Sequence, residues 1–152
     1  MHNAPEQIKC VLLTLQSENV IVPNAAIAEI TPARDVSTVD NAPDWLLGKM
    51  LWRGVEVPMI SFETAGGYSG KVSTSTQIAV LYGVGNGSAF PYLGLAISGV
   101  PHVSTFTREQ IRADEQADDS HPMVAQKIRV NGAAASILDI EAMQSMVQQA
   151  SV

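Results

Sequence analysis

The side chain best suited to chemistry in this sequence is Arg53, which lies in the run LLGKMLWRGVEVPMISF over residues 46–62. Two apolar stretches flank Arg53-Gly54, so the chain must reverse there, and Gly54 supplies the positive φ that a tight turn needs. A guanidinium stays charged and offers five donors in fixed directions, but it has no basic lone pair. The pattern therefore predicts a β-hairpin whose cationic tip binds a partner rather than making or breaking bonds.

The remaining reactive residue types do not form a recognisable catalytic or ligand-binding set. His102 and His121 are far apart in sequence and lack the spacing of metal ligands on a helix, and His2 lies near the N-terminus. The acidic residues at 114, 115, 118 and 119 lack the alternation and glycine of a calcium loop, so they are interpreted as a solvated loop. The glycine-rich segment 83–88 lacks the third glycine of a dinucleotide-binding loop. No serine lies in a Gly-x-Ser-x-Gly elbow. The sequence predicts no catalytic, cofactor-binding or metal-binding residue and no enzyme.

Composition limits the class of protein. The 152 residues suffice for one domain or two very small fused ones, and 46% hydrophobic with 16% charged residues excludes a disordered chain. The net charge is −6 and the basic residues are scattered, which argues against binding to nucleic acid or to an anionic membrane. Cys10 is the only cysteine, so an intrachain disulfide is excluded. With no signal-peptide pattern and no apolar run of membrane-spanning length, the expected location is the cytoplasm, without direct membrane insertion.

Short apolar runs separated by turn residues predict a mainly β protein. Asn131-Gly132 marks a second tight hairpin, and residues 25–30 could be strand or helix. Strands are expected over residues 8–15, 20–22, 77–82, 92–97, 102–106, 123–130 and 133–138. This recurrence at spacings of about 8–12 residues is typical of small antiparallel barrels or a sandwich.

Three helix starts are predicted from capping signals. Asn41-Ala42-Pro43 would begin a short helix with Trp45, Leu46 and Leu47 on its apolar side and Gly48 as its stop. Thr107 and Gln110 fit a capping box. Asp139 would cap a final helix with Ile140, Met143 and Val147 on one face and Gln144, Gln148 and Gln149 off it.

The predicted organisation is a flexible tail over residues 1–7 and one domain over 8–150. The loop-like segment 65–75 is the best candidate for a seam, which gives subdomains of approximately 17–70 and 76–150, with strand 8–15 unassigned. Because each half carries a tight X-Gly hairpin, the two subdomains are expected to be similar small barrels. Trp45 and Trp52 are interpreted as core anchors, or, for Trp52, equally as a partly exposed interface anchor beside the hairpin tip.

Five short segments, in this order, together resemble a CheW-like domain, the family of coupling proteins in bacterial chemosensory arrays. They are residues 27–30 (IAEI), 51–62 (LWRGVEVPMISF), 94–100 (GLAISGV), 107–112 (TREQIR) and 137–140 (ILDI). The resemblance covers nearly the whole chain beyond residue 8. It implies two five-stranded SH3-like β-barrels packed on a shared apolar core. It also implies an adaptor that couples the tips of methyl-accepting chemoreceptors to the regulatory domain of a CheA-type histidine kinase.

Departures from the family's hairpin motif point to a divergent member. Leu51 stands where the motif has asparagine, Trp52 where it has leucine, and Ser61 where it has aspartate. The pathway served is therefore expected to be a specialised one, such as pilus-based motility. A rival interpretation is a degenerate adaptor that binds one partner only, as an array filler or competitor; a small ligand-binding or hydrolytic barrel is the third.

The resemblance also names candidate receptor-binding residues: Ile27, Glu29, Trp52 and Arg53. They would contact a helical receptor hairpin. The competing interpretation, given equal weight, is that Arg53 pairs with a nearby carboxylate to fix the hairpin and that Ile27 belongs to the core.

Overall fold

Two β-sheets and a C-terminal helix make up the fold. The computed structural model describes residues 7–15, 18–67, 77–84, 90–115 and 121–150. The strands are β1 (Gln7–Thr14), β2 (Asn19–Pro23), β3 (Ile27–Pro32), β4 (Val36–Ser37), β5 (Leu46–Trp52), β6 (Val55–Ile60), β7 (Gln77–Tyr82), β8 (Tyr92–Ile97), β9 (His102–Thr107), β10 (Ile111–Ala113), β11 (Val124–Val130) and β12 (Ala133–Leu138). The helices are α1 (Phe62–Ala65), α2 (Ile140–Gln149) and the 3-10 turns η1 (Asn24–Ala26) and η2 (Arg108–Gln110).

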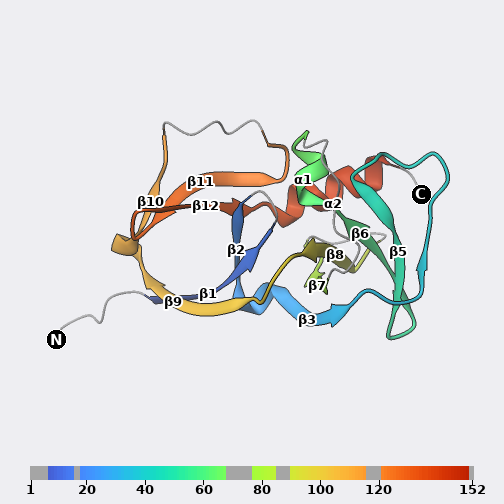
Figure 1. The fold of residues 1–152 in the computed structure, drawn as a ribbon, viewed down its shortest axis with the longest axis horizontal. Helices are drawn as coiled ribbons and strands as arrows, with labels where there is room; N and C mark the ends of the chain where they lie inside the picture. The colour runs from blue at the N-terminus through green and yellow to red at the C-terminus, as the bar shows by residue number, and fades with distance from the viewer. Residues whose placement is uncertain (1–6, 16–17, 68–76, 85–89, 116–120, 151–152) are drawn as a thin grey trace.

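Each sheet contains six strands. Sheet A has the order β10-β11-β12-β2-β1-β9, and sheet B has the order β4-β5-β6-β8-β7-β3 (Figure 1). The edge strands of each sheet are consecutive in the chain, joined by η2 in sheet A and by residues 33–35 in sheet B. Such short connections span at most about 14 Å, so each sheet must curve toward a barrel. The mainly β class with two β units and a terminal helix is confirmed, with six strands in each sheet rather than the expected five.

The two sheets share one layout, but the halves of the chain exchange their first hairpins. The β1–β2 hairpin joins β9–β12 in sheet A, whereas the β7–β8 hairpin joins β3–β6 in sheet B. In each sheet the hairpin meets the four-strand unit through a parallel contact, β2 with β12 and β8 with β6. The segments 17–70 and 76–150 therefore do not coincide with the two sheets, because strands that are neighbours in sequence pair in different sheets.

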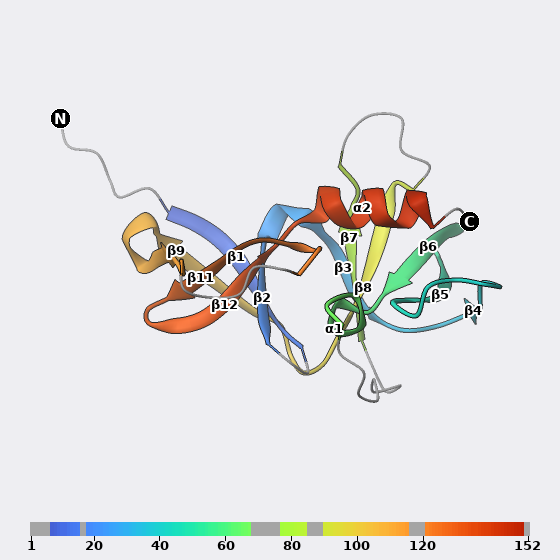
Figure 2. The same ribbon diagram turned by 90° about the horizontal axis from the view of Figure 1, so that it is seen from above.

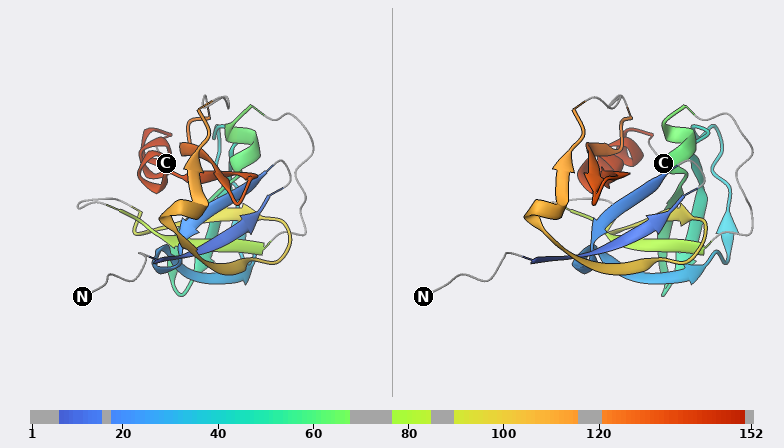
Figure 3. Two further views of the ribbon diagram at one scale, coloured as in Figure 1. Left: turned by 90° about the vertical axis from the view of Figure 1, so that its left-hand side faces the viewer. Right: turned by 60° about the vertical axis from the view of Figure 1, so that its left-hand side comes forward.

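Apolar side chains form three clusters. The largest lies between the sheets and includes Leu13 and Val20 from sheet A, Leu81 and Leu95 from sheet B, and Met143 from α2. The two smaller clusters lie on the opposite faces of the sheets, one on sheet B and one on sheet A. These faces, which point into the curve of each sheet and away from the large cluster, are called the inner faces. Helix α2 follows β12 of sheet A but lies along sheet B (Figure 2), and β1 and β2 cross in front of β7 and β8 (Figure 3). The cluster between the sheets is the shared apolar core.

Both predicted hairpin turns are confirmed. Arg53 and Gly54 have φ of 48° and 77°, and Asn131 and Gly132 have φ of 49° and 86°. Positive φ at both central residues defines the type I′ turn, whose twist matches that of the flanking strands. The capping box over residues 107–110 and the Asp139 cap, which accepts from the Ala142 N–H at 3.0 Å, are also present.

The helix predicted to start at Asn41 is wrong, because residues 41–45 form turns that lead directly into β5. Asn41 has a φ of 59°, which is incompatible with a right-handed helix. Gly48 is not a helix stop: it follows an irregularity in the β5–β6 pairing, and a Cβ there would lie 2.5 Å from the Ser37 carbonyl oxygen on β4. Pairing with β4 and β6 overrides the capping signal.

The structure decides the secondary structure of residues 25–30, and it differs from the sequence-based expectation at α1 and at Gln144. Residues 25–30, left open between strand and helix, hold part of η1 and β3. The sequence did not predict α1, which Ser61 caps by accepting from the Thr64 N–H at 3.3 Å. Gln144, expected off the apolar face of α2, is 4% exposed. Its amide accepts from the Val84 N–H at 2.9 Å and donates to the Phe90 carbonyl at 3.1 Å, so it stabilises a loop rather than facing solvent.

His121 fastens the segment before β11 to α1. Its Nδ1 accepts from the Met123 N–H at 3.0 Å, so Nε2 carries the proton and donates to the Phe62 carbonyl at 2.8 Å. The imidazole also stacks on the Phe62 ring, with centroids 3.9 Å apart. This arrangement requires the neutral ring. Burial lowers the pKa of His121; the Phe62 carbonyl and the carboxylate of Glu18 act to raise it, and the Lys127 ammonium to lower it.

We expect the free energy of unfolding to fall as the pH drops below about 6.5, the ordinary value for histidine. In that range the unfolded chain takes up a proton at His121 that the folded chain resists, so acid favours unfolding. The loss should stay below about 1.4 kcal/mol per pH unit, the limit for one proton, because solvent reaches part of the ring. Urea unfolding between pH 7.5 and 5.5 measures it. The slope of the free energy of unfolding against pH should shrink in His121→Gln. It should persist in His102→Gln, because His102 is exposed. Equal slopes in the two variants would contradict the assignment of the pH dependence to His121.

Candidate functional site

The structure brings Glu29, Trp52 and Arg53 together at one end of sheet B. Glu29 comes from β3, Trp52 ends β5, and Arg53 occupies the turn to β6. The two carboxylate oxygens of Glu29 are used separately: Oε2 accepts from the Trp52 indole N–H at 2.8 Å, and Oε1 accepts from Arg53 Nη2 at 2.9 Å. The guanidinium also lies over the Trp52 ring, 4.9 Å from its centroid. The three side chains thus form a closed set of contacts from two separate parts of the chain.

The electrostatics favour an ionised Glu29. The hydrogen bond from Trp52, followed by that from Arg53, holds the pKa of Glu29 below its ordinary value, while desolvation acts in the opposite direction. The Arg53 side chain remains 67% exposed. The ion pair therefore fixes the position of a guanidinium that still faces solvent.

Trp52 is a core residue with one polar atom at the surface. It is 9% exposed and packs with Met50, Val57 and Met59 on the inner face of sheet B. Its ring meets the edge of Tyr92 at a centroid distance of 4.8 Å. Of the two interpretations of Trp52, the structure supports the core anchor. Trp45 is half-buried and packs against the shared core, also as an anchor.

Ile27 does not share the surface formed by the other three candidates. It is half-buried, lies opposite Leu81 in β7 and packs against the shared core. An irregularity in the β3–β7 pairing between Ile27 and Glu29 separates the two positions. Both parts of the competing interpretation are therefore seen: Arg53 pairs with a carboxylate, and Ile27 contributes to the core.

Two exposed apolar residues lie on the strands that carry or neighbour this site, and the sequence did not predict their exposure. Leu51 on β5 is 52% exposed, and Tyr82 at the end of β7 is 47% exposed. The Tyr82 ring lies 5.7 Å from that of Tyr92, which in turn contacts Trp52, so a row of aromatic rings connects the surface to the site. No sequence signal distinguishes these residues from ordinary buried strand residues, because their exposure depends on where each strand ends.

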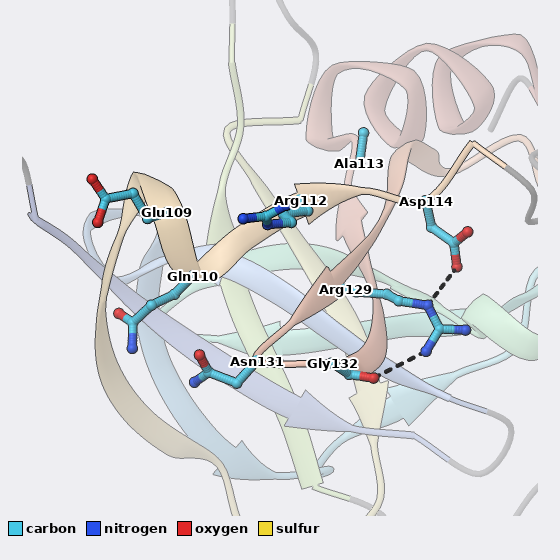
Figure 4. A pocket seen from close by; sticks show the side chains of 8 residues that line it. All are labelled: Glu109, Gln110, Arg112, Ala113, Asp114, Arg129, Asn131 and Gly132. Carbon is cyan, nitrogen blue, oxygen red and sulfur yellow. Dashed lines mark hydrogen bonds and ion pairs between the residues drawn. The ribbon is translucent and has the colours of Figure 1, made fainter.

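A second concave surface lies on sheet A, between η2, β10 and the β11–β12 hairpin (Figure 4). Its volume is about 290 Å³, and six of its eight lining residues are polar, with no histidine, cysteine or serine among the eight. Arg129 turns toward Asp114, 3.3 Å away, and donates to the Gly132 carbonyl at 2.9 Å. Arg129 therefore stabilises the β11–β12 hairpin through contacts inside this part of the fold. The residues that line the surface include no nucleophile with an adjacent base.

Among the described residues, no group of three or more His, Cys, Asp or Glu side chains is placed to hold a metal ion. None of the helices in the described ranges is long and apolar enough to cross a membrane. The charged groups at this site are the Glu29 carboxylate, Arg53 and the nearby Arg34, whose charge also lowers the pKa of Glu29; neither guanidinium can act as a base.

Comparisons with known proteins agree with the fold. The family model of the CheW-like domain matches residues 9–148. A crystal structure of the scaffolding protein TtCheW from Thermoanaerobacter tengcongensis superposes with a TM-score of 0.72 at 17% sequence identity, over 91% of this chain and 88% of that one. A search of curated proteins finds no match. CheW-like proteins are non-catalytic scaffolds of chemotaxis signalling, and the family match spans most of the sequence. This chain belongs to the CheW-like domain family.

Proposed function

We propose that this protein couples chemoreceptor tips to a CheA-type histidine kinase, in the cytoplasm, and that Arg53 contacts the receptor. The observation that carries the assignment of the surface is the Glu29–Arg53 pair. It holds a mostly exposed guanidinium at a fixed place over the Trp52 ring. The family match and the scaffolding protein of similar fold support the coupling role.

The arrangement prepares Arg53 for binding. Within the described part of the chain, Nη2 is the guanidinium atom engaged by Glu29, which leaves Nε and Nη1 to donate to a partner. Because the side chain is already held, less rotamer entropy is lost when a partner binds. The fitting partner is a helical surface that presents a carboxylate or carbonyl to Arg53 and an apolar side chain to Tyr82, whose ring is connected to Trp52 through Tyr92.

Coupling of this kind needs no reaction on the adaptor itself. A receptor and a kinase held together by one scaffold can bias each other's conformational equilibrium, provided that the scaffold binds the two states of either partner differently. The two sheets give the molecule two separate surfaces, one for each partner.

Arg53→Glu should weaken binding to a purified receptor-tip fragment by at least about tenfold, because it places a second carboxylate beside Glu29 and reverses the charge offered to the partner. Co-sedimentation or titration calorimetry measures the affinity, with circular dichroism to check the fold. Arg112→Glu is the matched control: Arg112 is an exposed arginine on β10 of sheet A. Unchanged affinity in folded Arg53→Glu would remove Arg53 from the site.

The departures from the family motif motivate the second candidate, an adaptor that binds one partner only. Leu51, at the asparagine position of the motif, exposes an apolar side chain, and Ser61, at the aspartate position, caps α1. Co-sedimentation with receptor alone, kinase alone and both together separates the candidates. A bridged ternary complex supports coupling, whereas binding to a single partner supports a filler or competitor. A specialised pathway, such as pilus-based motility, is part of the same proposal.

A further inference from the structure

The inner face of sheet A contains an apolar pocket. The pocket has a volume of about 140 Å³, and only apolar atoms contribute to its exposed lining. Side chains from five strands surround it, mainly isoleucines: Ile8, Cys10, Ile21, Pro23, Ile111, Ile128 and Ile137. Ile8, at the start of β1, is 40% exposed and stands at the rim.

The shared layout of the two sheets explains why this space is empty. Arg53 and Asn131 begin the two hairpin turns, and Ser61 and Asp139 follow the two hairpins at equal separations along the chain. Each residue of the β5–β6 hairpin therefore has a counterpart in the β11–β12 hairpin. The cross-strand pair Met50–Val57 in sheet B matches Ile128–Ala135 in sheet A. At the position matching Trp52, sheet A has Val130.

The side chains at these positions are smaller in sheet A than in sheet B. In sheet B the Trp52 ring packs on the inner face with Met50 and Val57. In sheet A Val130 and Ala135 stand in place of the indole and of Val57. Cys10 and Ile21 face them, and Phe106 of β9 packs against the same cluster without being among the residues that line the pocket. The pocket is partly open to solvent, so an apolar hollow is left at the surface of sheet A.

We propose that this pocket is a binding site for a small, uncharged apolar molecule of about the size of benzene. An enclosed aliphatic-lined cavity of about 150 Å³ in another protein binds benzene or xenon; the present pocket is similar in size and in its apolar lining, but it is open to solvent on one side. A charged or strongly polar ligand does not fit, because the lining offers it no hydrogen-bond partner and would strip its water. Burial raises the pKa of the Cys10 thiol, so the lining also stays neutral. The site is on the other sheet from Arg53 and does not depend on the proposed receptor contact.

Benzene is the probe for the test, added to the full-length chain labelled at isoleucine methyl groups. We expect saturable shifts of the Ile8, Ile111, Ile128 and Ile137 methyl resonances, with the Ile140 methyl, which packs on the shared core, unaffected. Two changes at one lining position give the matched pair: Cys10→Met should fill the pocket and weaken binding at least tenfold, whereas Cys10→Ala should retain it.

The proposal is overturned if the wild-type shifts grow linearly without saturation, if they spread evenly over the isoleucines, or if Cys10→Met binds benzene as the wild type does. Should Cys10→Met fail to fold, Val130→Phe restores an aromatic ring at the position of Trp52 and should abolish the shifts in the same way.

Discussion

Trp52→Ala should lower the free energy of unfolding by about 3–5 kcal/mol, the range measured for removal of large buried aromatic side chains. The indole is 9% exposed, and its loss would leave a cavity beside Met50, Val57 and Met59. It would also remove the N–H that binds Glu29. Chemical denaturation followed by circular dichroism measures the change, which is a large fraction of the roughly 5–15 kcal/mol that stabilises a typical domain.

Trp52→Phe separates packing from hydrogen bonding. It keeps an aromatic ring in the core but has no N–H for Glu29, so the expected destabilisation is about 1–2 kcal/mol and the pKa of Glu29 should rise toward its ordinary value. A titration of the Glu29 carboxyl by NMR reads the second effect. If Trp52→Ala were no more destabilising than Trp52→Phe, the interpretation of Trp52 as a core anchor would be wrong.

Gly66→Ala should destabilise the fold by about 2–3 kcal/mol through a clash with His121. A Cβ at Gly66 would lie 2.7 Å from His121 Nε2 and nearer still to Cδ2. The ring cannot swing aside freely, because both its nitrogens are hydrogen-bonded and it stacks on Phe62. Backbone conformation is not the obstacle, since Gly66 has a φ of −86°, which alanine adopts easily.

A double-mutant cycle identifies the cause. In the His121→Ala background the ring is absent, so adding Gly66→Ala should cost less than about 0.5 kcal/mol. Urea unfolding of the four proteins gives the coupling free energy. Additive effects would mean that the methyl group at position 66 meets something other than His121.

Local chemistry made several elements predictable. Arg53-Gly54 and Asn131-Gly132 specify tight turns through backbone conformation alone, and the cap at Asp139 depends on a side chain three residues from its donor. The same kind of signal failed at residues 41–48, because a one-turn capping signal is weaker than pairing along two strands. The expectation that Gln144 lies off the buried face of α2 is wrong, because its partners, Val84 and Phe90, are distant in sequence.

The candidate site was also predictable from the sequence only in part. The hairpin motif identified Arg53 and Trp52, and the resemblance added Glu29. The sequence does not determine whether Glu29 meets them, because β3 and β5 are not neighbours in the sheet and only the curvature of sheet B brings their ends together. The predictions for the seam at 65–75, the acidic residues 118 and 119, and the tail fall largely outside the described residues.

By itself the sequence determined the mainly β class, the two type I′ turns, the terminal helix and the family, since alternation, turn residues and caps act over a few positions. Tertiary structure alone decided the exchange of hairpins between the sheets, the burial of Trp52 against Glu29, and the unfilled pocket beside Cys10. Each of these depends on contacts between segments far apart in the chain, whose free energy no local pattern encodes.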